Sequence, residues 1–169
     1  VAAGKYDDFL AESKTLGFKG IEVSDGSTTI DANTRGELIV KAKEAGFYVI
    51  SEVGKKNPEL DHELTPAERV KLMNEDLKNG SNYVIIEARE AGKNIGIYDA
   101  NGNIVADELD ALTPDGIDHI TFEEPLKGQQ TALILKYGPK VNIGNIPHHA
   151  VTSVATLTRG LRPDTAGKV

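Results

Sequence analysis

The 169-residue sequence predicts an α/β protein of the TIM-type (βα)8 barrel class, built around a parallel sheet. Short β-rich runs alternate with helix-like stretches along the chain, which is the pattern of βα units. Each expected strand ends in polar residues, and in a barrel the C-terminal strand ends converge on one active site. An open doubly wound sheet would spread them along one edge, so this pattern favours the barrel.

Hydrophobic spacing and end signals define the elements of the first half. Thr65 and Glu68 have the spacing of a capping box, with Pro66 at the first helical position and Gly80 as the stop. Gly17 is expected to end an amphipathic helix that begins near the N-terminus. In order, we expect a helix over 5–16, a strand over 20–24, a helix over 33–45, a strand over 47–53 and a helix over 66–79.

The second half continues the same alternation. We expect strands over 83–87, 120–123 and 141–143, and helices over 127–137 and 148–159. The sequence DANG (99–102) between two isoleucine-bearing runs is typical of a small hairpin or excursion over 95–105. Nothing in the sequence divides the chain, so we expect a single, partial barrel domain over 1–169. Five strands are too few to close a barrel of this class, which has eight.

Composition excludes several classes of function. The net charge is −7, so a general affinity for nucleic acid or acidic membranes is not expected. No apolar run approaches the roughly 20 residues that span a bilayer. Cysteine is absent, and the N-terminus has no signal-peptide pattern, so the cytoplasm is the expected location. The chain opens at Val1 within a helix pattern, which processing or a missing upstream segment would explain.

Glutamates end three of the expected strands: Glu52, Glu87 and Glu123. A strand covered on both faces is normally apolar throughout, so carboxylates in these runs are costly unless paired or bound to metal. Together they indicate an oxygen-rich site for a hard divalent ion such as Mg²⁺. The alternative is that each glutamate forms an ion pair with a neighbouring lysine or arginine.

Cations follow the same strand ends, in the loops that carry Lys55, Lys56, Arg89, Lys93, Lys127, Arg159 and Arg162. On an acidic protein, cations beside a metal site indicate phosphate, carboxylate or sulfonate groups in the substrate. The alternative is a set of solvated charged loops, which we prefer for Lys56 or Lys93 alone. His148 and His149 are adjacent and point in different directions, so surface or capping roles are favoured over metal binding.

Six motifs in collinear order resemble the phosphosulfolactate synthase family of coenzyme M biosynthesis. They are IEVSDGSTTI (21–30), SEVGKK (51–56), NYVIIEARE-x-GK (82–93), TFE-x-P-x-K-x-QQ (121–130), VNIGNI (141–146) and TLTRGLR-x-DT (156–165). The resemblance implies a carbon–sulfur lyase that adds sulfite to phosphoenolpyruvate with Mg²⁺, giving 2-phospho-3-sulfolactate. Family members carry three further βα units upstream, so we expect this chain to lack the first three. Its unpaired edges would then lie at 20–24 and 141–143, and a homo-oligomer is expected.

For this reaction, position and charge indicate roles for particular residues. Glu52, Glu87 and Glu123 would hold Mg²⁺, and Lys55 would protonate C2 of the substrate, since a lysine among other cations gives up its proton more readily. Arg89 would act beside Lys55 on the substrate anion. The other expected substrate ligands are Ser24, Lys127, Asn142, Arg159 and Arg162.

The chain departs from the family pattern at three positions: Ala91, Glu124 and Pro163. Glu124 is expected to add a negative charge beside Glu123, Ala91 to remove a hydroxyl, and Pro163 to stiffen the last loop. The alternative hypothesis is a non-catalytic relative of the family, similar to plant heat-stress-associated proteins.

Overall fold

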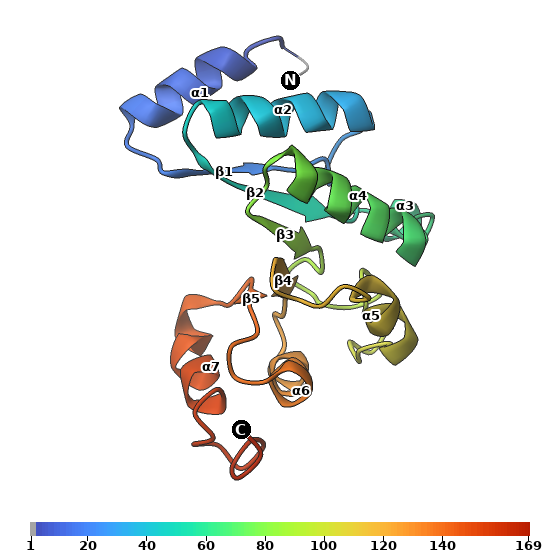
Figure 1. Ribbon diagram of the computed structural model, residues 1–169. Helices are drawn as coiled ribbons and strands as arrows, with labels where there is room; N and C mark the ends of the chain where they lie inside the picture. The colour runs from blue at the N-terminus through green and yellow to red at the C-terminus, as the bar shows by residue number, and fades with distance from the viewer. Residues whose placement is uncertain (1–2) are drawn as a thin grey trace.

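A computed structural model describes residues 3–169, and at its centre lies a parallel sheet (Figure 1). Its strands follow chain order: β1 (Gly20–Val23), β2 (Tyr48–Val53), β3 (Tyr83–Ile86), β4 (Ile120–Glu123) and β5 (Ile143–Gly144). Every neighbouring pair is parallel. The predicted α/β class with a parallel sheet is therefore confirmed.

Helices follow the strands and cover one side of the sheet (Figure 1). They are α1 (Tyr6–Thr15), α2 (Ala32–Glu44), α3 (Pro58–Asp61), α4 (Pro66–Asn79), α5 (Ala106–Leu112), α6 (Lys127–Tyr137) and α7 (Val151–Leu157), with a 3-10 turn η1 (His148–Ala150) before α7. The capping box of α4 is confirmed, because the Thr65 hydroxyl accepts from the Glu68 N–H and the Glu68 carboxylate accepts from the Thr65 N–H. Gly80 ends this helix in the left-handed region.

Two predicted elements have different bounds in the structure. The fifth strand was expected over 141–143 but pairs only at Ile143–Gly144, beside Phe122 and Glu123, because the turn from Gly138 to Val141 holds the chain just before it. The last helix was expected over 148–159. It begins as a 3-10 turn and ends at Leu157, where the N–H of Gly160 donates to the Leu157 carbonyl.

The excursion expected over 95–105 is present. Tyr98 forms isolated antiparallel bridges with Ile95 and Ile104, so the segment folds back on itself between β3 and α5. The short helices α3 and α5 were not expected, since four and seven residues are too few to show a clear helical period.

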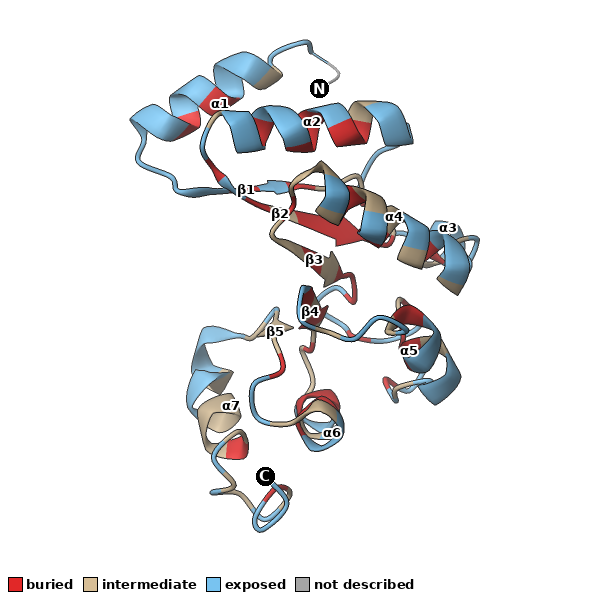
Figure 2. Ribbon diagram, in the orientation of Figure 1, coloured by how far each residue is buried: buried red, intermediate tan, exposed pale blue. Residues whose placement is uncertain are grey.

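The hydrophobic core lies between the sheet and its helices. Side chains alternate along each strand, so Ile21, Val23 and Val49 pack beneath α1 and α2, while Val84 and Phe122 pack beneath the later helices. Figure 2 shows the buried side of the helices turned toward the sheet. Within residues 3–169, no helix is long and apolar enough to cross a membrane.

The opposite face of the sheet is more open. It carries Tyr48, Ile50 and Ile85, and Tyr48 is 47% exposed. Strands β1 and β5 are the two ends of the strand order, and over the described residues they do not pair with each other. This face, called the inner face below, carries the candidate site.

Candidate metal and anion site

Three glutamates meet at the C-terminal ends of β2, β3 and β4. Parallel pairing aligns these strand ends, and side-chain alternation directs Glu52, Glu87 and Glu123 to the inner face. One carboxylate oxygen from each residue lies within 4.8 Å of the others. Glu52 is 3% exposed and Glu87 1%, so the structure gathers the three predicted carboxylates into one largely buried cluster.

The hydrogen bonds of this cluster leave two oxygens free. Glu123 accepts from the N–H groups of Ala88 and Arg89, each at 2.9 Å, and Glu87 Oε1 accepts from the Arg89 N–H at 2.8 Å. Among the described residues, the buried Glu52 Oε1 and Glu87 Oε2 have no hydrogen-bond partner. The Lys56 ammonium lies 4.0 Å from Glu87 Oε2, beyond hydrogen-bonding distance. Individual ion pairs therefore do not satisfy the cluster.

Burial and the neighbouring negative charge raise the pKa of two of these acids, Glu52 and Glu123. Burial raises the pKa of Glu52 to about 8, and the neighbouring Glu87 charge adds to that rise. Burial also raises the pKa of Glu123, with the Glu87 charge acting in the same direction and the N–H of Ala88 opposing it. Hard oxygen donors with unpartnered buried lone pairs suit a divalent cation, which would displace the protons.

A cavity of about 600 Å³ lies beside the glutamate cluster. Gly26 separates the two, since a Cβ added there would lie 3.0 Å from Glu52 Oε1 and 3.2 Å from the Lys56 side chain. The cavity is lined by Gly26, Ser27, Thr28, Thr29, Lys55, Lys56, Asn57, Pro58, Leu60 and Arg89. Three cations on its wall suit it to an anionic ligand.

Arg89 reaches this cavity through an unusual backbone. Its φ is 59°, in the left-handed region that few non-glycine residues adopt, and its single backbone N–H donates to both Glu87 and Glu123. Its guanidinium donates to the Lys56 carbonyl at 2.6 Å. The predicted position of Arg89 beside the glutamates is thus what the structure shows.

Lys55 also lines the cavity. Its ammonium pairs with the Asp25 carboxylate and lies 3.4 Å from the Thr28 carbonyl. It was expected to lie among other cations, and Lys56 and Arg89 do line the same cavity, while its direct hydrogen-bond partners are oxygens of Asp25 and Thr28. Its proposed role as a proton donor remains a prediction.

The other expected substrate ligands are not among the described residues that line the cavity, and this includes Ser24, which directly follows β1. Lys127 is exposed and pairs with Asp164 at 2.6 Å. The Asn142 amide donates to the Ile120 carbonyl, at the start of β4. Arg159 donates to the Ala155 carbonyl and Arg162 to the Thr156 hydroxyl. None of these four residues is among the described residues that line the cavity.

Glu124 does not place a charge beside the glutamate cluster, contrary to the expectation. It points to the other side of β4, is fully buried, and accepts a hydrogen bond from the Tyr98 hydroxyl. Burial raises the pKa of Glu124 to about 8. Strand alternation explains the correction, because adjacent residues face opposite sides of a sheet.

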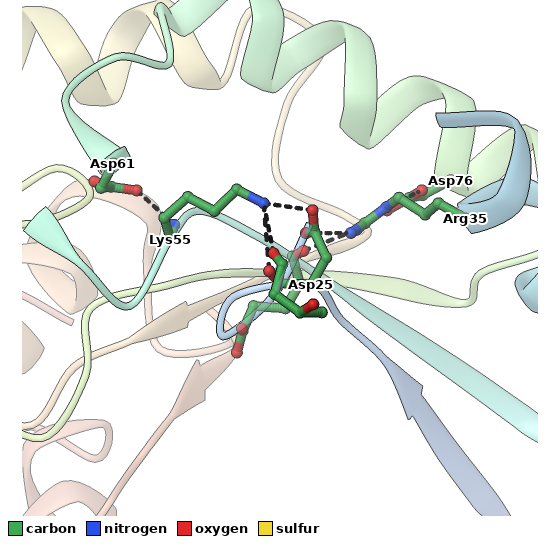
Figure 3. A network of polar contacts seen from close by, with 7 residues as sticks. Asp25, Arg35, Lys55, Asp61 and Asp76 are labelled. Atoms are coloured by element: carbon green, nitrogen blue, oxygen red, sulfur yellow. Dashed lines mark hydrogen bonds and ion pairs between the residues drawn. The ribbon is translucent and has the colours of Figure 1, made fainter. Parts of the chain in front are cut away.

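A buried polar network behind the site was missed by the sequence reasoning (Figure 3). Arg35 and Asp76 are 3% and 2% exposed and form an ion pair between α2 and α4. Arg35 shares one helix face with Leu38, Ile39 and Ala42, which are all buried. A charged residue on an otherwise apolar helical stripe is the sequence signal that would have revealed it.

Fold and site together define a class: a parallel βα protein with a carboxylate cluster and a cationic cavity where its strands end. Residues 1–164 match the family described as (2R)-phospho-3-sulfolactate synthase (ComA), and the chain belongs to that family.

Individual relatives carry the same name. The chain is 50% identical over 167 residues to the phosphosulfolactate synthase of Methanocaldococcus jannaschii, covering 98% of this chain and 66% of that protein. For that of Methanothermobacter thermautotrophicus the identity is 48% over 166 residues, covering 98% and 64%. For that of Bacillus subtilis it is 34% over 167 residues, covering 98% and 66%. The chain therefore spans about two thirds of the length of these relatives.

Proposed function

We propose that this chain carries the active site of a phosphosulfolactate synthase, a carbon–sulfur lyase that adds sulfite to phosphoenolpyruvate in coenzyme M biosynthesis. The product would be 2-phospho-3-sulfolactate, formed in the cytoplasm. The observation that carries the proposal is the three-glutamate cluster, with two unpartnered buried oxygens, beside a cavity walled by three cations. Both substrates are small anions, which is the ligand chemistry that this cavity favours. The names of the relatives support the same reaction.

Mg²⁺ fits the residues present. Glu52, Glu87 and Glu123 would hold it through carboxylate oxygens, the donors that this hard cation prefers. Bound there, it would stabilise negative charge that develops on the substrate carboxylate. The raised pKa of Glu52 means that this side chain would release a proton when the cation binds.

The reaction makes two bonds to the substrate. The sulfur lone pair of sulfite forms a bond to C3 of the enol phosphate, and the C2–C3 π electrons move to C2 and its carboxylate. A proton then adds to C2. Lys55 is our choice of donor, since its half-buried ammonium lines the cavity. Arg89 and Lys56 would neutralise the phosphate and sulfonate charges there.

We also propose that the sheet is part of a TIM-type (βα)8 barrel. Helices on one side, a partly exposed inner face and two unpaired edges support this arrangement. In a closed barrel the inner face would be filled by side chains from the remaining strands, and the strand ends would surround one site.

The test measures turnover by the full-length protein when it is supplied with sulfite, phosphoenolpyruvate and Mg²⁺. Phosphorus NMR would follow the disappearance of phosphoenolpyruvate and the appearance of the sulfonated product. We expect Glu87→Gln to lose turnover and Lys71→Met, on the exposed face of α4, to keep it. Binding of Mg²⁺ without any product would instead support the non-catalytic reading.

A further inference from the structure

Four charged side chains connect the helix layer to the candidate site. Asp76 on α4 pairs with Arg35 on α2, Arg35 pairs with Asp25 after β1, and Asp25 pairs with Lys55 after β2 (Figure 3). The charges alternate in sign along this series, so each carboxylate lies beside at least one cation. Lys55 is the only one of the four that lines the cavity within the described residues.

Arg35 contacts both the backbone of Glu52 and the aspartate that pairs with Lys55. Its Nε donates to Asp76 Oδ1 at 2.9 Å, and its Nη1 donates to Asp25 Oδ1 at 2.9 Å. Its Nη2 donates to the backbone carbonyl of Glu52 at 2.8 Å. One planar guanidinium thus fixes the strand residue that bears a cluster carboxylate and, through Asp25, the ammonium of Lys55.

Only arginine offers this combination. Its donors form a rigid planar fork, whereas a lysine ammonium is a single point that cannot reach three acceptors on different elements in fixed directions. Asp25 divides its two oxygens, with Oδ1 toward Arg35 and Oδ2 toward Lys55. The orientation of Asp25, and with it the position of Lys55, therefore depends on Arg35.

Stability alone does not account for the network. Taking Arg35 and Asp76 out of water is costly, and well-packed apolar residues of similar size often replace such a buried pair without loss of stability. Their hydrogen bonds fix the orientation of Asp25 and of the Glu52 carbonyl. This geometry matches a role in positioning the site residues.

We infer that Arg35 is a positioning residue that places Lys55 and Glu52 relative to each other, with Asp76 fixing the orientation of its guanidinium. The catalytic part of this inference rests on the proposed function. The geometric part does not, because it concerns the backbone of the site and its affinity for a cation.

The test compares the wild type with Arg35→Lys and with the double variant Arg35→Met/Asp76→Leu. The double variant removes both charges, so neither is left buried and unpaired. We expect kcat for sulfite addition to fall about 10- to 100-fold in both variants, as for a small misplacement of reacting groups. The KM for phosphoenolpyruvate should change little, because Arg89 and Lys56 remain in the cavity.

The Arg35→Lys variant distinguishes the effect of the positive charge from the effect of the guanidinium geometry. Arg35→Lys keeps the positive charge, so wild-type kcat in that variant would overturn the inference. The control is Lys41→Met/Asp7→Leu, which removes an exposed ion pair between α1 and α2. It should keep wild-type kcat. Wild-type kcat in a folded Arg35→Met/Asp76→Leu protein would also overturn the inference.

Two measurements without substrate distinguish this inference from the proposed function. Mn²⁺ binding, followed by electron paramagnetic resonance, should weaken in the double variant, and amide hydrogen exchange over 24–29 and 52–57 should speed up. If the wild type binds Mn²⁺ but does not turn over, the proposed function fails while these readouts still support positioning. Unchanged Mn²⁺ affinity and exchange in the double variant would overturn it. If that variant does not fold, Arg35→Lys supplies the same readouts.

Discussion

The protonation of single carboxylates governs the ionic state of the candidate site. Glu52 and Glu87 are almost fully buried, and each has an oxygen without a hydrogen-bond partner among residues 3–169. Such a pair is stable in water-free surroundings only when it shares protons or a cation.

Cation affinity at the cluster should rise with pH. Glu52 has a pKa raised to about 8, so at pH 7 it is mainly protonated, and a bound cation must displace that proton. We expect Mg²⁺ affinity to increase from pH 6 and to level off above about pH 8, with proton release measurable by calorimetry in two buffers. Glu52→Gln should weaken binding and remove most of this pH dependence. A pH-independent affinity in the wild type would contradict the prediction.

Glu124 should make stability fall as pH rises. Its folded-state pKa is about 8 against an ordinary value of 4.5, so between these values the folded chain keeps a proton that the unfolded chain has released. That contribution is fully present below pH 4.5 and is lost as pH rises, at about 1.4 kcal/mol per pH unit for one group. Urea unfolding from pH 5 to 8 should show a steeper fall for wild type than for Glu124→Gln. Identical slopes would contradict it.

Lys55 and Arg89 should affect different kinetic constants. Lys55→Met removes the proposed proton donor, so we expect kcat to fall by about 10²- to 10⁴-fold. Arg89→Lys keeps the charge and loses two-pronged contact with an oxyanion, so mainly KM should rise. Steady-state kinetics with both substrates separates the two effects. Unchanged kcat in Lys55→Met would leave Lys56 or a water molecule as the donor.

Among the elements, the excursion between β3 and α5 supports the end of β3. The Gly96 N–H donates to the buried Asp61 carboxylate at 2.8 Å, and a Cβ at Gly96 would lie 2.3 Å from the Glu87 carbonyl oxygen. Asp61 also accepts from the Lys55 N–H and pairs with Arg69. The loop after β2 and the excursion are therefore held by one carboxylate.

Gly96→Ala should disturb the site, whereas Gly116→Ala should not. Both glycines have positive φ, so each alanine pays a left-handed strain of about 1–2 kcal/mol. At Gly116 a Cβ meets no described atom within 4 Å, but at Gly96 the Glu87 backbone must move. We expect a larger loss of unfolding free energy and weaker Mn²⁺ binding for Gly96→Ala alone. Equal effects of the two substitutions would contradict this account.

For the whole molecule, the inner face and the sheet edges are the features open to other chains. Tyr48 is 47% exposed and stacks on Tyr83, with ring centres 6.4 Å apart. Unpaired parallel edges and exposed apolar surface favour association. A chain of these 169 residues should therefore associate as its concentration rises, as judged by sedimentation velocity.

Tyr48→Lys should weaken that association, because it places a charge on the exposed inner face. Tyr48 lies at the start of β2, away from the three glutamates at the strand ends. Leu135→Lys is the matched control, since Leu135 is 40% exposed on α6, away from the inner face. Association that is equally reduced by both variants would indicate general solubility rather than a role for the inner face.

Local chemistry made much of the structure predictable. Strand β4 and helix α6 match the expected residues because β-branched runs and helical spacing there agree with their surroundings. The capping box of α4 required only two residues three apart. The period-2 rule directed Glu52, Glu87 and Glu123 to one face, so their convergence could be inferred from the sequence once the strands were aligned in parallel.

Tertiary structure alone decided the partners of the charges. Lys127 begins α6 and was expected to bind an anion, yet it pairs with Asp164, and Lys55 pairs with Asp25 thirty residues away. The buried pair of Arg35 and Asp76 joins α2 and α4, which are separated in sequence by strand β2 and the short helix α3. Such pairings depend on how packed elements bring distant residues together, and periodicity along one element carries no information about them.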